Sequence, residues 1–240
     1  AIDTDAIIEL LQSHQKAPKS SYQGLALELK EAVEKQPEKF SSDIDYYKDV
    51  NIIYINSITL GFEESLKKNN ILEWDNILPF YKRLIESDNH YKNNEQESPS
   101  FIYLTIAKLL SVGMKSNRKS LEQQLTPLVK GILFKLFELS IQQIDSVDKI
   151  FDFHSYLLNS TIGVVILSLI DYSLLSAQMA STNQAIRWED DIRQKFDLCI
   201  EKRVIDIYVT LGMYFKNIYY LDQEWTTHTI RSFYNLEKKY

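Results

Sequence analysis

The chain has 240 residues, of which 45% are hydrophobic and 25% are charged, and its net charge is −6. This apolar content is enough for a buried core and excludes an intrinsically disordered segment. Only 6 Gly and 5 Pro are present, whereas β-sandwiches, β-barrels and nucleotide-binding α/β domains need these residues at turns and phosphate loops. The composition therefore predicts long helices with few breaks. The excess of acids also opposes non-specific binding of nucleic acid, although a local basic patch would survive it.

The composition also bears on the cellular location. Cys199 is the only cysteine, so neither an intrachain disulfide nor a multi-cysteine zinc site can form. Residues 1–11 lack the basic and apolar regions of a signal peptide. The most apolar run, Ile162 to Ile170, is much shorter than the roughly 20 residues of a membrane span. We therefore expect a cytoplasmic protein without a membrane partner, and the absence of a starting Met suggests a piece of a larger protein.

Apolar residues at helical spacing predict a series of helices with short connections. In chain order, the predicted helices cover residues 6–11, 25–36, 37–47 (a short helix and a turn), 50–68, 74–85, 101–113, 120–139, 160–180, 185–202, 203–221 and 222–236. Residues 50–68 are rich in isoleucine, as many strands are, but their length favours a helix. The polar stretch 87–100 is the predicted loop and the softest junction of the chain.

Two of these helices leave details open. The helix over 120–139 begins either at a Ser120 cap or at Thr126-Pro127. The helix over 160–180 is hydrophobic nearly all round, which predicts burial on several sides. Residues 142–153 are expected to form a connector.

The predicted fold class is all-α, with about ten helices in antiparallel hairpins that form an α-solenoid, and residues 1–240 are expected to be a single domain. Gly61, Gly131 and Gly212 fall inside predicted helices. A glycine there costs about 1 kcal/mol relative to alanine, and close helix–helix approach is one reason to accept that cost. No clean repeat period is visible, so any repeats are degenerate.

An ordered set of motifs between Leu25 and Trp225 resembles a helical region of large uncharacterised bacterial proteins. The matching strings are Gly61-Phe62-Glu63-Glu64-Ser65-Leu66, Trp74-Asp75-Asn76-Ile77-Leu78, Ile106-Ala107-Lys108-Leu109-Leu110-Ser111-Val112-Gly113, Leu158-Asn159-Ser160-Thr161-Ile162-Gly163 and Leu221-Asp222-Gln223-Glu224-Trp225. The resemblance implies a HEAT-like repeat region of a multidomain protein whose activity lies in a sirtuin-like or nucleoside-triphosphatase domain. Several such proteins look like anti-phage defence factors. The chain departs from this pattern at Asn76, where relatives often have Pro, and at the extra Pro79.

No residue pattern predicts a catalytic, cofactor or metal site. The four histidines are far apart in sequence, and no phosphate-binding or nucleophile motif occurs. Glu189-Asp190-Asp191 lies on a predicted helix, where adjacent side chains point to different sides, which favours a solvated face over cation binding. Cys199 lies near an apolar seam and is expected to be a small buried residue. We therefore expect neither ATP hydrolysis nor NAD cleavage by this chain.

Three features are candidate interaction sites. Lys115, Arg118 and Lys119 lie in a predicted helix–helix loop, which either meets a phosphate or an acidic partner or is an ordinary solvated loop. Asp222 is a predicted N-cap, and Trp225 is either the buried anchor of the last helix or part of a ligand site. A dense aromatic set has the spacing of a core and the composition of an interface: Tyr208, Tyr214, Phe215, Tyr219, Tyr220, Trp225, Phe233 and Tyr234.

The sequence interpretation is a non-catalytic scaffold or sensor within a larger cytoplasmic protein. Its expected partners are other domains of the same protein or a separate protein, and self-association is left open. Two alternatives remain: an enzyme whose site is assembled from distant helices, and a nucleic-acid-binding module that uses the loop around Lys115 to Lys119.

Overall fold

The computed structural model describes residues 3–14, 19–87, 100–115, 121, 123–142, 152–180 and 187–237. All regular elements in these ranges are helical, which confirms the all-α prediction. The elements are α1 (Thr4–Ser13), α2 (Lys19–Lys35), α3 (Pro37–Ser42), the 3-10 turn η2 (Ile44–Tyr47), α4 (Ile52–Lys67), α5 (Trp74–Glu86), α6 (Ser100–Lys115), the 3-10 turn η3 (Gln123–Leu125), α7 (Thr126–Ser140), α8 (Phe153–Asn159), α9 (Thr161–Met179), α10 (Asp190–Glu201), α11 (Ile205–Met213), α12 (Phe215–Leu221) and α13 (Gln223–Glu237).

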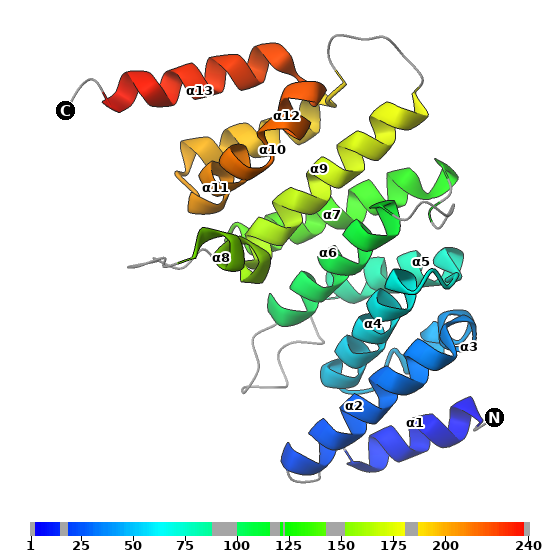
Figure 1. Cartoon of the computed structure of the whole chain (residues 1–240). Helices are drawn as coiled ribbons and strands as arrows, with labels where there is room; N and C mark the ends of the chain where they lie inside the picture. The colour runs from blue at the N-terminus through cyan, green and yellow to red at the C-terminus, as the bar shows by residue number, and fades with distance from the viewer. Residues whose placement is uncertain are drawn as a thin grey trace.

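The helices are stacked in order along the molecule (Figure 1). One row runs from α2 to α4, then to α6, and then to α9, with each helix packed on the next. A second row runs from α3 to α5 and on to α7, which also contacts α9. Beyond α9, the short helices α8, α11 and α12 pack against it, and α13 packs on α12 at the C-terminal end.

α9 is the central helix of the second half of the fold. It begins at a Ser160 cap, whose hydroxyl oxygen accepts a hydrogen bond of 3.2 Å from the Gly163 N–H. Residues 162–173 are all buried, as the sequence predicts for a helix that is hydrophobic nearly all round. Among the described helices, α9 alone has the length and composition of a membrane span, but 61% of its apolar window lies inside the fold, as in a core helix.

The number and limits of the helices differ from the prediction of about ten. Thirteen α-helices occur in the described ranges, because α8 forms after the expected connector and the predicted helix 203–221 divides at Tyr214. Gly212 lies two residues before this break, and the two halves, α11 and α12, each pack against α9. The helix predicted from residue 185 begins at Asp190, because Arg187 N–H donates to Leu221 O and holds the preceding backbone against α12. α7 takes the later of its two predicted starts, at Thr126.

Close helix–helix approach, predicted at three glycines inside helices, is confirmed at one of them. A Cβ on Gly61 would lie 2.7 Å from Lys30 O and from Val33 Cβ, so this glycine permits the close approach of α2 and α4. Around Gly131 and Gly212 nothing lies within 4 Å of a Cβ position, and the expectation of close packing there was wrong. The predicted junction at 87–100 falls almost wholly on residues 88–99, outside the described residues.

Ion pairs attach the C-terminal helices to the rest of the stack. Lys130 of α7 lies 2.5 Å from Glu189 and 2.6 Å from Asp191 at the start of α10. Lys195 of α10 pairs with Glu138 of α7 at 3.8 Å, and the ammonium groups of Lys130 and Lys195 both lie over the Phe134 ring. The acidic run at 189–191, predicted to be a solvated face, therefore contributes two of its three carboxylates to the positioning of α10.

Candidate functional site

An aromatic cluster fixes the start of α13 against α10. The Trp225 ring stands edge-on to Trp188 and Phe196, with centroids 5.0 Å and 6.3 Å apart, and Trp188 also packs edge-on against Phe196. Trp225 Nε1 donates a hydrogen bond of 2.8 Å to Asp197. Trp225 is only partly buried, whereas Trp188 is 4% exposed. The fully buried anchor of this region is therefore Trp188, which the sequence analysis did not single out.

Asp222 makes the N-cap hydrogen bond that the sequence predicts. Its Oδ1 accepts from the Trp225 N–H at 2.9 Å, and the side chain is almost completely buried. Its second oxygen pairs with Arg193 at 3.4 Å, and Arg193 also pairs with Asp190 at 2.9 Å. Asp222 thus links the cap of α13 to α10.

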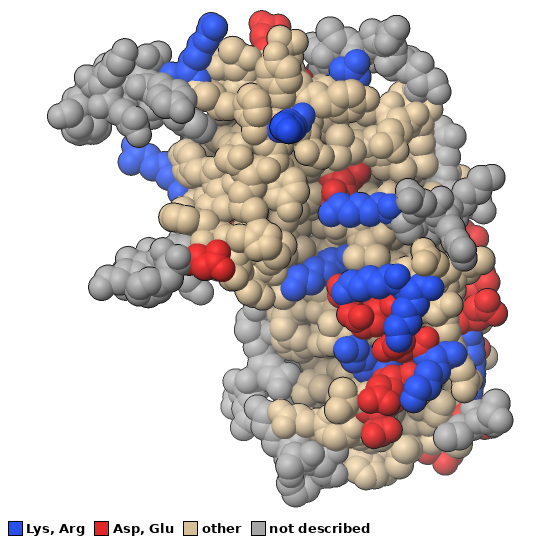
Figure 2. All heavy atoms as spheres, in the orientation of Figure 1, with Lys and Arg blue, Asp and Glu red and all other residues tan. Residues whose placement is uncertain are grey.

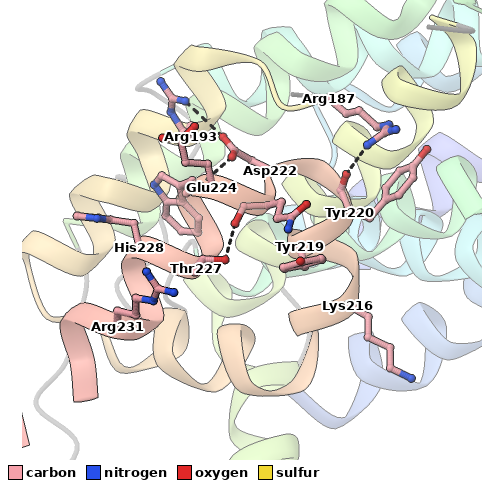
Figure 3. Close-up of a pocket in the computed structure, with 12 residues that line it drawn as sticks. Arg187, Arg193, Lys216, Tyr219, Tyr220, Asp222, Glu224, Thr227, His228 and Arg231 are labelled. Carbon is pink, nitrogen blue, oxygen red and sulfur yellow. Dashed lines mark hydrogen bonds and ion pairs between the residues drawn. The ribbon is translucent and has the colours of Figure 1, made fainter. Parts of the chain in front are cut away.

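A pocket of about 1210 Å³ opens between α10, α12 and α13 (Figure 3). Trp225 and Asp222 lie in its wall. The cap hydrogen bond fits a structural role for this pair, and the position in the pocket wall is compatible with ligand binding. The lining residues are Arg187, Arg193, Lys216, Tyr219, Tyr220, Asp222, Gln223, Glu224, Trp225, Thr227, His228 and Arg231.

Exposed aromatic rings continue from this pocket along α12. Phe215 and Tyr219, four residues apart on one face, have ring centroids 5.6 Å apart and are 39% and 38% exposed. Tyr220, on the pocket wall, is 45% exposed, and the Arg187 guanidinium lies over its ring at 4.5 Å. We call Phe215, Tyr219 and Tyr220 the aromatic surface. The core interpretation of the aromatic set is wrong for these three residues and for Tyr208; the side chains of Phe233 and Tyr234 lie outside the described residues.

The surface over α11 to α13 carries fewer charged side chains than the surface over α2 and α4 (Figure 2). Figure 2 shows acidic and basic side chains crowded together over α2 and α4, whereas the described part of the face over α11 to α13 carries only a few charged side chains, which stand apart from one another. Lys216 and Arg231 did not stand out in the sequence, and His228 was considered there only as one of four separated histidines. Lys216 lies three residues before Tyr219 and His228 three residues before Arg231, a spacing that places each pair on one helix face.

Lys115, the first of the predicted loop cations, is engaged within the fold. It is the last residue of α6, and its ammonium group lies 2.8 Å from Asp171 Oδ2 on α9. The Ser111 hydroxyl donates to the same oxygen at 2.6 Å. Burial raises the pKa of Asp171, so loss of the Lys115 charge would leave a poorly solvated carboxylate. Arg118 and Lys119 lie outside the described residues.

A buried polar cluster lies where α8, α9 and α11 meet. The Asp206 side chain is fully buried; Oδ2 accepts a hydrogen bond of 3.3 Å from the Tyr156 hydroxyl, and Oδ1 has no partner among the described residues. Burial raises the pKa of Asp206. Burial, together with the charge of Asp206, raises the pKa of the neighbouring Cys199 to about 12. The Cys199 thiol is therefore protonated near neutral pH, as suits a small core residue and not a nucleophile.

We expect Asp206→Asn to remove part of the pH dependence of stability. Because the folded pKa of Asp206 is above its unfolded value, the unfolded chain loses its proton first as the pH rises. The free energy of unfolding contributed by Asp206 therefore falls with rising pH above the ordinary aspartate range. Urea unfolding measured from about pH 4 to about pH 7 should show that the free energy of unfolding decreases less with rising pH for the variant than for the wild type. Asp49→Asn, at an exposed position, is the control; identical pH profiles for Asp206→Asn and wild type would contradict the assignment.

Comparison of this chain with protein-family models, curated proteins and solved structures gives no match. Within the described residues, no group of three or more His, Cys, Asp or Glu side chains is arranged to hold a metal ion. The candidate site therefore consists of the pocket between α10, α12 and α13 together with the aromatic surface beside it.

Proposed function

We propose that this chain is a non-catalytic helical scaffold that binds another protein through the aromatic surface of α12. Exposed aromatic rings carry the proposal. Aromatic side chains are enriched at protein interfaces and supply most of the binding energy at their centres. Phe215, Tyr219 and Tyr220 expose rings on a short helix whose opposite face, with Ile218 and Leu221, is buried.

The partner is a protein segment with apolar side chains and acidic flanking residues. The apolar side chains would pack on the aromatic rings, and the acidic residues would match the cations that line the adjoining pocket. The net charge of −6 opposes a nucleic acid as partner. The pairing of Lys115 with buried Asp171 also weakens the alternative in which the loop after α6 meets phosphates.

The arrangement of helices supports an α-solenoid as the architecture of this scaffold. In an α-solenoid, each helical unit packs mainly on the next, and the stack presents an extended binding surface. The two rows from α2 to α9 and from α3 to α7 fit that description. We further propose, from the resemblance of the sequence motifs, that the chain belongs to a HEAT-like region of a larger cytoplasmic bacterial protein of the anti-phage-defence type.

The proposal is tested by placing a photo-crosslinking amino acid at Tyr219 in the parent protein, with the same substitution at Tyr46 as control. Tyr46 is an exposed aromatic residue on η2, which packs against α1 and α5 near the N-terminal end of the stack, whereas α12 lies at the other end. We expect a crosslink to a defined protein segment from position 219 and none from position 46. The double variant Phe215→Ser/Tyr219→Ser should then abolish binding of that purified segment. Equal crosslinking at both positions, or crosslinking to nucleic acid from position 219, would contradict the proposal.

A further inference from the structure

The pocket beside the aromatic surface carries an excess of positive charge although the chain is acidic overall. Four cationic side chains line it, Arg187, Arg193, Lys216 and Arg231, against the two carboxylates of Asp222 and Glu224. This local balance is opposite to the net charge of −6 of the whole chain.

Two of the four cations are already engaged within the fold. Arg187 donates a hydrogen bond of 3.0 Å to Tyr220 O and lies over the Tyr220 ring. Arg193 pairs with Asp222 and Asp190. These contacts position α10 against α12 and α13, so neither arginine is free to meet a ligand without loss of a structural contact.

Lys216 and Arg231 differ from the two engaged arginines. Both are exposed, and neither makes an ion pair with any residue in the described part of the chain. Figure 3 shows them on two different helices that border the pocket, Lys216 on α12 and Arg231 on α13, with Tyr219 also on α12. His228, one turn before Arg231, lines the same wall. The pocket is thus bordered by two available cations, which lie on opposite sides in Figure 3, and by the Tyr219 ring, so a ligand that meets both cations must be an extended one.

We propose that this pocket binds an acidic stretch of a protein partner, whose carboxylates pair with Lys216 and Arg231 while an apolar side chain packs on Tyr219. This inference rests on the proposed docking function and names the chemistry of the partner at the same site. The volume of about 1210 Å³ exceeds the range of roughly 300–1,000 Å³ that is usual for small-molecule sites, which favours an extended segment.

The observations favour an acidic peptide over single-stranded nucleic acid. Nucleic acid is held by a basic groove that follows the phosphate backbone over several nucleotides. Here only two cations are available, and Glu224 lies in the same wall. A short acidic peptide needs no more than a few charge pairs, and its few carboxylates meet less repulsion from the acidic remainder of the chain than a phosphate at every nucleotide would.

The test measures the binding of a fluorescein-labelled peptide of alternating Glu and Leu to the whole chain by fluorescence anisotropy at low salt. A peptide with Gln in place of Glu and a single-stranded oligonucleotide serve as comparison probes. We expect the Glu peptide to bind most tightly, and added salt to weaken it, because exposed charge pairs are screened. Trp225 lies in the pocket wall, so its emission provides a second signal of occupancy.

Charge-reversal variants locate the binding. Lys216→Glu/Arg231→Glu should weaken the Glu peptide by about tenfold or more, because each change replaces attraction by repulsion. Lys48→Glu/Lys82→Glu, two exposed positions near the N-terminal end of the stack, is the matched control because it reverses the same number of charges, and it should leave binding nearly unchanged. Equal binding of the Glu and Gln peptides, tighter binding of the oligonucleotide, or the same loss in Lys48→Glu/Lys82→Glu would overturn the inference.

Failure of this inference and failure of the proposed function are distinguishable. If the Glu peptide does not bind but the crosslink from position 219 in the parent protein persists, the acidic chemistry of the partner is wrong and the docking surface stands. If that crosslink is also absent, the docking function itself is wrong.

Discussion

Replacement of Gly163 by Ala is expected to destabilise the fold by about 3 kcal/mol, which for a chain of this size lowers the melting temperature by roughly 6–12 °C. A Cβ at this position would lie 2.6 Å from Asp206 Oδ1, 2.6 Å from Leu157 O and 2.8 Å from Leu157 Cδ1. The Leu157 carbonyl belongs to the backbone of α8 and cannot move away unless α8 moves as well. Thermal unfolding followed by circular dichroism measures the loss.

Gly131→Ala is the matched control for this prediction. Gly131 is also inside a helix, but it is exposed, and nothing lies within 4 Å of its Cβ position. Alanine should therefore raise stability there by about 1 kcal/mol through helix propensity alone. A Gly163→Ala chain that melts like the wild type would show that α8, α9 and α11 do not meet as closely as described.

Trp188→Ala is expected to cost about 3–5 kcal/mol, as for other buried aromatic residues truncated to alanine. The Trp188 ring is 4% exposed and packs against both Phe196 and Trp225. Its removal leaves a cavity at the point where α10 and α13 are joined. Trp225→Ala should cost less, about 2 kcal/mol, because part of its ring already faces the pocket.

Urea unfolding of the two tryptophan variants decides this order. Ile71→Ala, at a position that is 63% exposed, provides the baseline and should change stability by no more than about 0.5 kcal/mol. A larger loss for Trp225→Ala than for Trp188→Ala would reverse the assignment of the anchor. It would also restore the sequence interpretation, in which Trp225 is the buried residue that fixes the last helix.

Local periodicity predicted the helices well where one face of a helix meets the core. The helix predicted over residues 74–85 is α5, and its apolar residues at helical spacing are all buried: Ile77, Leu78, Tyr81, Leu84 and Ile85. The same reasoning failed between α11 and α12, because Gly212 was assigned to the interior of one helix, whereas the chain breaks two residues later at Tyr214 and both segments pack on α9. Periodicity reports which residues are apolar and not where a neighbouring helix requires the chain to bend.

The candidate site was only partly predictable for a similar reason. Asp222 was identifiable as a cap because capping depends on a few adjacent residues. The pocket was not predictable, since Arg187 precedes α10 and Arg193 lies on it, whereas Lys216 and Arg231 come from α12 and α13. The spacing of aromatic residues was equally consistent with a core and with an exposed surface, because a helix has two faces and periodicity does not say which one is covered.

The amino-acid sequence by itself determined the helical fold class, the succession of helices, the burial of α9 and the cap of α13, all of which depend on composition and on contacts within a few residues. Tertiary structure alone decided that Lys115 pairs with Asp171, that Gly61 lies at a close helix contact while Gly131 does not, and that Trp188 is buried while Trp225 borders a pocket. Each of these depends on which distant segment lies beside the residue, and that is fixed by the packing of the whole stack and not by any local pattern.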